Sequence, residues 1–429
     1  MLAIASEPIF ILADTAMIGR LGVEPLAARA IASSLIGGIY WLFAFLIFGT
    51  TTLVGYHRGA NEFETCGEIC LHALLLAAVG GIAVSILGIL FASHLYLLMG
   101  AEPDVLTQGS TYFRIRIAAA PFTFLFFATV GFLRGIQDTR TPMVIAFMVN
   151  GLNVVLDYLL IYGGLGFPAL GLRGAAVATL ISQILAGAIC LSILFLSSYA
   201  SQYGLNRWRF SMRRFLSLSR IGRDLAVRTG ALRFSLVFAT GTVARMGTVA
   251  LSSHEIALQL FLLSSDTIDG IAVAGQTLAA KYLGGNRSDK AYQMGKTLVL
   301  CGCVAGLIFG FGYIVLKQPL IALFTKNPEV TGLLGVSIFL LLALFQPANG
   351  IVFASDGFLI GAHDTRYLMW AMLIAALGIF VPISWISLRW DLGLVGVWTG
   401  LCSLMAWRLG TNLFRFFSRR WVLAFPGKI

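Results

Sequence analysis

A ten-residue segment occurs twice in this chain, and each copy follows a proline at the same spacing. Residues 131–140 read GFLRGIQDTR and residues 357–366 read GFLIGAHDTR, with Pro121 and Pro347 ten positions before the respective copy. The prolines and the segments share one offset, since 347 − 121 = 226 and 366 − 140 = 226. The chain is therefore a duplicated half. In a membrane chain such a repeat predicts two helical bundles with a substrate path between them.

Two weaker echoes extend this repeat toward the start of each half. Residues 21–27 (LGVEPLA) resemble residues 251–257 (LSSHEIA) at an offset of 251 − 21 = 230. Residues 59–61 (GAN) resemble residues 284–286 (GGN) at an offset of 284 − 59 = 225.

The composition places the chain in a lipid bilayer. Of its 429 residues 58% are hydrophobic and 11% are charged, and the mean hydropathy is +0.88. One globular core could not bury so much apolar surface. Twelve apolar runs are long enough to span a bilayer as helices, near residues 2–19, 30–55, 70–99, 112–136, 142–164, 171–197, 224–251, 256–280, 293–316, 331–361, 367–388 and 393–415.

These runs predict an all-α, polytopic membrane protein with twelve transmembrane helices in two six-helix lobes. Since six is even, both lobes enter from the same side, and their pseudo-twofold axis is expected along the membrane normal. The expected division is an N-lobe over 1–200, a cytoplasmic linker over 201–223 and a C-lobe over 224–429.

The placement of basic residues predicts the orientation. They concentrate in the even loops and at the C-terminus, which indicates that these parts and both termini are cytoplasmic, in the inner or plasma membrane. The residues concerned are His57, Arg58, Arg140, Arg207, Arg209, Arg213, Arg214, Arg220, Arg223, Lys281, Arg287, Lys290, Arg366, Arg415, Arg419 and Arg420. The pI of 9.6 then reflects the basic residues of the cytoplasmic loops, and no nucleic-acid partner is expected.

Cysteine and histidine patterns indicate neither a metal site nor an active site. Cys66 and Cys70 are one helical turn apart, and the other four cysteines lie in apolar spans without ligand-type neighbours. The five histidines are scattered and form no catalytic pattern. We therefore expect no enzyme, no cofactor and no disulfide framework.

Polar residues inside the spans are the informative ones, because a carboxylate in hydrocarbon costs several kcal/mol. Asp14 is surrounded by apolar residues in the first span. Asn153 and Asp157 are four residues apart in the fifth span, which places both on one helical face. The eighth span contains Asp266, Asp269 and Gln276 within SSDTIDGIAVAGQ.

Asp14 and Asp157 are expected to act together. Two carboxylates in one low-dielectric cavity repel each other, so either one binds a proton or both share a small cation. Asn153 and Thr179, in GAAVAT of the sixth span, could add neutral oxygens. The alternative is that Asn153 hydrogen-bonds a neighbouring helix and Thr179 packs in a small-residue interface.

The two halves differ at these positions. At the offset of 230 Asp14 corresponds to Ala244, and at 226 Asp157 corresponds to Ile383, so the cation site is expected in the first half. The second half keeps Asp269, Gln276 and Asp356, which could meet a positively charged substrate. The alternative for these acids is hydrogen bonding at helix ends or between helices.

Five segments resemble the multidrug and toxic compound extrusion (MATE) transporters. They are DTAMIGRLG from Asp14, RGAN from Arg58, LRGIQDTRTP from Leu133, NVVLD from Asn153 and GAAVAT from Gly174. The segments IDG at 268–270 and SDG at 355–357 look more like the DNA-damage-inducible (DinF) branch than the NorM branch. The match covers almost the whole chain.

The resemblance implies secondary antiport by alternating access, with organic cations or amphipathic compounds exported in exchange for H⁺ or Na⁺. By matching position, Asp14 is the coupling acid, Asp157 its partner, and Asn153 and Thr179 are neutral ligands. A possible Na⁺ at this site is the only metal expected. The expected partners are a small-molecule substrate and the bilayer, and the expected state is a monomer. Family members have a longer first helix, so a start at Met1 implies a truncated, tilted or membrane-thinning first span.

Two other functions remain open at this point. A lipid-linked saccharide flippase of the same superfold would share the repeat but would need a strongly cationic central cavity. The arginines that could supply one are Arg114, Arg116, Arg228, Arg233 and Arg245. An intramembrane enzyme would need a histidine-rich or serine-based constellation, which this sequence does not show.

Overall fold

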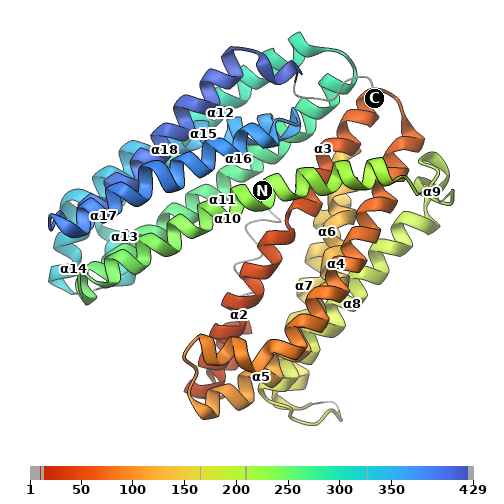
Figure 1. Ribbon diagram of the computed structural model, residues 1–429. Coiled ribbons are helices and arrows are strands. Elements are labelled where there is room, and N and C mark those ends of the chain that lie inside the picture. The colour runs from red at the N-terminus through yellow and green to blue at the C-terminus, as the bar shows by residue number, and fades with distance from the viewer. Residues whose placement is uncertain (1–9, 11–13, 165, 208–209, 326, 424–429) are drawn as a thin grey trace. The chain divides into compact units, whose positions relative to one another are not determined.

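The computed structural model describes residues 10, 14–164, 166–207, 210–325 and 327–423. These residues are predominantly helical, and none of them belongs to a named strand (Figure 1). The chain divides into two compact units, Met1–Gly222 and Arg223–Ile429. Most of the expected first span, residues 2–19, lies outside the described residues.

The first unit is a helical bundle in which two spans are interrupted. α2 and α3 meet at Ala44 and together form one apolar stretch of 36 residues. α5 and α6 are bent by 43° relative to each other, where Pro121 lies in the first turn of α6. The helices are α2 (Val23–Phe43), α3 (Phe45–Gly59), α4 (Phe63–Leu98), α5 (Pro103–Ile117), α6 (Ala120–Gly135), α7 (Arg140–Tyr162), α8 (Leu172–Leu196) and α9 (Ser198–Gln202).

The second unit repeats this plan with more local irregularity. Two π-helical turns interrupt its spans, and Pro347 lies inside α15 rather than at a helix start. Its elements are α10 (Met212–Ala244), α11 (Thr248–Gly284), α12 (Ser288–Val315), α13 (Lys317–Phe324), α14 (Pro328–Leu333), η1 (Leu334–Ile338), α15 (Phe339–Gly361), α16 (Thr365–Leu373), η2 (Ile374–Phe380), α17 (Val381–Arg389), α18 (Gly393–Phe417) and η3 (Arg420–Leu423). α10 begins within the expected linker over 201–223 and runs on into this unit.

Among the described residues, eight helices are long and apolar enough to cross a membrane, or nine when α5 and α6 count as one span. α10 and α18 have 33 and 25 residues and are also of spanning length, but they carry arginines. Every expected span after the first coincides with one of these helices or helix pairs. The expected all-α, membrane-spanning architecture is confirmed.

The repeat is visible in the backbone itself. Four pairs of residues with positive φ recur at an offset of 225 or 226, namely Gly22 and Gly247, Asn61 and Asn286, Gln137 and His363, and Gly166 and Asp391. Gly22 and Gly247 directly precede α2 and α11, which fixes the register there at 247 − 22 = 225. The offset of 230 inferred for residues 21–27 is therefore wrong, because a short apolar echo is a weaker marker than the start of a helix. Asp14 corresponds to Ala239, not to Ala244.

Close helix packing is repeated as well. A β-carbon on Gly81 of α4 would lie 2.7 Å from the nitrogen of Pro121, and one on Gly306 of α12 would lie 2.6 Å from the Cα of Pro347. The two glycines are 225 residues apart and the two prolines 226. Each proline therefore lies against a glycine of the neighbouring helix, and the duplicated proline keeps its duplicated partner.

Substitution of Gly302 tests how much this packing contributes to stability. A β-carbon there would lie 2.8 Å from the Ala354 Cβ and 2.9 Å from the carbonyl carbon of Gly350, in the interface of α12 with α15. We expect Gly302→Ala to destabilise the protein by about 1–3 kcal/mol, the usual cost of overpacking. Gly312→Ala in the same helix is the control, because nothing lies within 4 Å of its position. The control is expected to gain up to about 1 kcal/mol, and thermal unfolding in detergent measures both. Equal midpoints for the two variants would contradict the packing argument.

Candidate functional site

Asp14 is paired with an arginine that the sequence analysis did not single out. Arg29 of α2 donates to Asp14 Oδ2 from Nη2 at 2.7 Å and from Nε at 3.1 Å. The two side chains are only 11% and 15% exposed, Arg29 and Asp14 respectively. The negative charge of Asp14 is therefore compensated by Arg29 within the protein, so that Asp14 is not a bare carboxylate in this structure.

Asp157 of α7 is in the opposite situation. Its side chain is completely buried, and neither carboxylate oxygen has a hydrogen-bond partner among the described residues. The charges that act on it are those of Asp14, Arg116 and Arg29. A buried carboxylate without hydrogen bonds is costly when ionised, so this group is poised to bind a proton or a cation.

The side chain of Asn153, on the same helix α7 as Asp157, contacts the side chain of Thr179 on α8. The Asn153 amide donates to Thr179 Oγ1 at 3.4 Å, and the Thr179 hydroxyl donates to the Ala175 carbonyl oxygen at 3.1 Å. No hydrogen bond joins this pair to Asp14 or Asp157 in the part of the chain that is described. Of the four predicted residues, Asn153 and Thr179 therefore form a neutral hydrogen-bonded pair, whereas Asp14 acts on Asp157 through its charge.

Arg116 and Tyr112 complete the polar group of the first unit. Both lie near the C-terminal end of α5, one helical turn apart, and the Tyr112 side chain is 1% exposed. The charges of Asp14 and Asp157 act on Arg116. We call Asp14, Arg29, Tyr112, Arg116 and Asp157 the first-unit cluster. The sequence analysis named Arg116 only as one of the arginines that could line a cationic cavity, and it did not single out Tyr112.

Asp356 is the centre of a second cluster. Both Arg228 of α10 and Arg408 of α18 pair with Asp356 Oδ2, and the Asn412 amide donates to Oδ1 at 2.7 Å. The Asp356 residue is 4% exposed and Arg408 is 3% exposed. We call Arg228, Asp356, Arg408 and Asn412 the second-unit cluster. It ties together three helices, which is the interhelical alternative considered above for this acid.

The other two predicted substrate residues, Asp269 and Gln276, both lie on α11. Asp269 of α11 is half-buried, and the charges of Asp266, Arg228, Asp356 and Arg408 act on it. Gln276, two turns further along α11, is 2% exposed and lies where Gly361 of α15 crosses closely. Of the three residues, Asp269 is therefore the one that keeps partial access.

The two clusters occupy different positions of the repeat. Asp14 and Asp157 correspond to Ala239 and Ile383 in the second unit. Asp356 corresponds to Val130 in the first unit, since 356 − 226 = 130. Each unit thus has these buried acids at positions where the other has apolar side chains.

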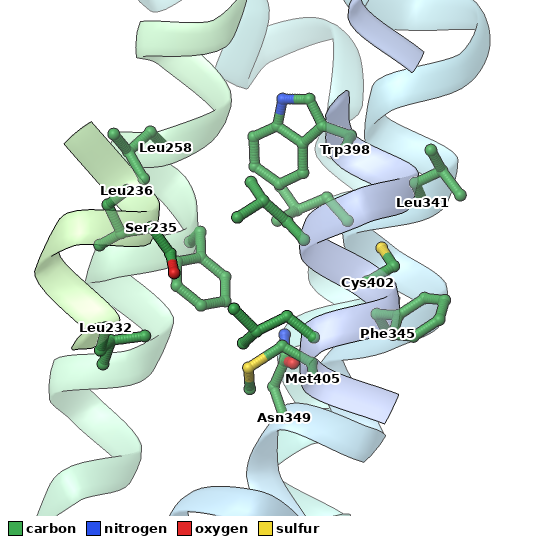
Figure 2. Close-up of a pocket in the computed structure, with 14 residues that line it drawn as sticks. Leu232, Ser235, Leu236, Leu258, Leu341, Phe345, Asn349, Trp398, Cys402 and Met405 are labelled. Atoms are coloured by element: carbon green, nitrogen blue, oxygen red, sulfur yellow. The ribbon is translucent and has the colours of Figure 1, made fainter. Parts of the chain in front are cut away.

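A cavity lies within the second unit between α10, α11, α15 and α18. Its walls are almost entirely aliphatic and aromatic, and its polar members include Ser235, Asn349 and Trp398. Figure 2 shows Trp398 at one end of the cavity and Asn349 at the other. Over the described residues, no group of three histidine, cysteine or acidic side chains is placed to hold a metal ion.

Comparison with known proteins gives consistent results. The MatE family model matches residues 1–159 and 231–386. "Protein DETOXIFICATION 44, chloroplastic" of Arabidopsis thaliana is 30% identical over 439 residues, with 96% of this chain and 80% of that protein covered. "DNA damage-inducible protein F" of Escherichia coli is 26% identical, with 96% and 89% covered. "Probable multidrug resistance protein NorM" of Thermotoga maritima is 24% identical, with 97% and 89% covered.

Solved structures show the same fold. A MOP superfamily transporter from Pyrococcus furiosus superposes with a TM-score of 0.87 at 22% identity, with 98% of this chain and 93% of that chain covered. A multidrug resistance MATE family transporter in an outward-facing conformation gives the same TM-score, identity and coverage.

Proposed function

This chain belongs to the MatE family of multidrug and toxic compound efflux transporters, which are membrane proteins and not enzymes, and from this membership we propose that it is a secondary antiporter. It exports cationic or amphipathic small molecules against an inward gradient of H⁺ or Na⁺. The observation that carries the proposal is the fully buried Asp157, whose carboxylate oxygens have no partner among the described residues. An ionisable group in that position inside a span is a functional candidate.

The surroundings of Asp157 favour a proton as the coupling ion. A sodium ion needs several oxygen ligands, whereas Asn153 and Thr179 are already hydrogen-bonded to each other and Asp14 is held by Arg29. Arg116 adds a positive charge that acts on Asp157 and opposes a second cation. A proton needs no coordination shell and neutralises the carboxylate directly.

In this proposal Asp14, Arg29 and Arg116 set the field in which Asp157 exchanges its proton. When Asp157 is ionised, the two acids and two arginines sum to zero charge. When Asp157 is protonated, the cluster carries one positive charge, which weakens the binding of a cationic substrate in the same lobe. Asn153 and Thr179 hold α7 against α8 during this change. Asp269, with Gln276 further along α11 and Asp356 on α15, is the proposed contact of the second unit with a positively charged group.

Location and assembly are part of the same proposal. The basic loops support a cell or inner membrane location with both termini in the cytoplasm, and a monomer is sufficient because both lobes are on one chain. The flippase alternative is disfavoured, because Arg29, Arg228 and Arg408 are paired with acids and do not form an open cationic surface.

Separate collapse of the two ion gradients tests the proposal. The protein is reconstituted in liposomes with an imposed proton gradient or an imposed sodium gradient, and transport of a fluorescent organic cation is followed. We expect transport with the proton gradient alone, and its loss on addition of a protonophore. Transport that follows sodium alone would overturn the choice of ion. No transport with either gradient, from protein that unfolds cooperatively, would overturn antiport of organic cations.

A further inference from the structure

His254 of α11 is a completely buried histidine that the proposed antiport does not use. Its Nε2 lies 3.1 Å from Thr240 Oγ1, and the Thr240 hydroxyl donates its single proton to the Leu236 carbonyl oxygen, also at 3.1 Å. Thr240 can therefore only accept from the imidazole, so Nε2 carries the proton. The other nitrogen, Nδ1, is then an acceptor, and it has no partner among the described residues.

Trp398 of α18 offers the complementary group. Its ring lies edge-on to the His254 ring, with centroids 5.9 Å apart and an interplanar angle of 62°. The indole N–H is buried, and it too has no hydrogen-bond partner within the described part of the chain. A water molecule can accept from this donor and donate to His254 Nδ1. One such bridge would satisfy both groups, which are otherwise costly to bury.

Trp398 lines the cavity of the second unit, so a water molecule bound to the indole N–H would lie at the cavity wall. Trp398 lies at the same end of the cavity as Leu258, one helical turn from His254 (Figure 2). The cavity volume is about 30 Å³, enough for one or two water molecules. At the far end Asn349 Oδ1 is a further buried acceptor with no partner among the described residues.

The repeat gives His254 a counterpart with a charge. At the offset of 225 His254 corresponds to Arg29, and Ala239 corresponds to Asp14. The first unit therefore has a permanent cation paired with an acid at this position. The second unit has a side chain that can switch its charge and no acid in the corresponding place.

We propose that His254 is a proton-binding site of the second unit, which takes a proton at Nδ1 from water in the cavity. Thr240 keeps its hydrogen bond to Nε2, and the Trp398 ring stays in edge contact with the imidazole ring. The charged group that acts on His254 is the exposed Glu255 on the same helix. The other helices packed here contribute Thr240 and Ser235 from α10, Asn349 from α15, and Trp398 with the thiol of Cys402 from α18.

Tryptophan fluorescence of the purified protein tests the proposal without transport. An imidazolium in ring contact quenches indole emission, so we expect the emission of the wild type to fall as the pH is lowered from 8 to about 5. His254→Gln, which keeps hydrogen-bonding groups of similar size, is expected to lose this change. Trp398→Phe is expected to lose it as well, because it removes the reporting indole. His94→Gln is the matched control, since His94 is an exposed histidine in the first unit, and it is expected to retain the change.

The outcomes distinguish the proton site at His254 from the proposed antiport. Any role of His254 in coupling rests on the proposed antiport, whereas proton binding itself does not. A pH response of equal size in wild type and His254→Gln overturns the proton site, and so does a response unaffected by Trp398→Phe. Asp157→Asn is expected to keep the fluorescence response while it abolishes efflux. If the wild type shows no efflux but keeps a response that His254→Gln removes, antiport is overturned and the proton site stands.

Discussion

The Asp157→Asn variant is expected to lose ion-driven efflux completely while it folds as well as the wild type or better. Asparagine has nearly the same shape, so the packing of α7 is preserved. It cannot take up and release a proton, so the charge of the first-unit cluster no longer changes during the cycle. Efflux of a fluorescent cation should fall to the level of cells without the transporter.

Stability separates this result from misfolding. Asp157 is fully buried without hydrogen bonds in the described structure, and an ionised carboxylate in such a place lowers the free energy of unfolding. The neutral amide removes that cost, so the midpoint of thermal unfolding should stay the same or rise. A gain in stability with a loss of activity is typical of functional residues.

A matched substitution controls for the loss of an acid as such. Asp104→Asn removes an exposed carboxylate from the first turn of α5 and is expected to leave efflux unchanged. Normal gradient-driven efflux by Asp157→Asn would refute the assigned role. So would an equal loss in both variants, because the effect would then not be specific to the cluster.

The Asp356→Ala variant is expected to show the largest loss of stability. It leaves Arg228 and Arg408 without their shared partner, and Asn412 loses its acceptor at 2.7 Å. Removal of one member of a buried ionic group costs about 3–5 kcal/mol. The expected observation is a strongly lowered unfolding midpoint in detergent, or a protein that no longer accumulates in the membrane.

Two further variants identify the cause of that loss. Asp289→Ala breaks the exposed pair with Arg419, whose atoms are 2.9 Å apart, and a surface pair contributes little. The triple variant Asp356→Leu, Arg228→Met, Arg408→Met removes the charges together and should recover much of the lost stability, because uncompensated charge is then absent. Equal midpoints for Asp356→Ala and Asp289→Ala would show that the buried cluster contributes no more than a surface pair.

The transmembrane spans and the repeat could be predicted, because apolar runs and repeated segments are patterns that extend over many residues. All expected spans after the first coincide with helices, and Pro121 and Pro347 lie against equivalent glycines. The burial of Asp157 was also predictable, since an acid within a transmembrane span is expected to face the interior of the protein.

The partners of the acids were not predictable in the same way. Arg29 is fifteen residues from Asp14, and Arg408 is 52 residues from Asp356, so neither pair follows from helical periodicity. Arg116 was named only as a possible member of a cationic cavity, because the sequence does not show that α5 ends at Ile117 and bends into α6. Which arginine meets which acid depends on how helices cross, and one sequence does not encode this as a pattern.

The glycine–proline contacts and the buried acids divide the repeat into a part that the halves share and a part in which they differ. Gly81 with Pro121 and Gly306 with Pro347 are equivalent contacts, so each half brings two helices together at the same pair of residues. Asp14, Asp157 and Asp356 have apolar residues at the equivalent positions. The duplicated framework is therefore symmetric in its packing and asymmetric in its charge, so that one backbone plan holds two different electrostatic fields.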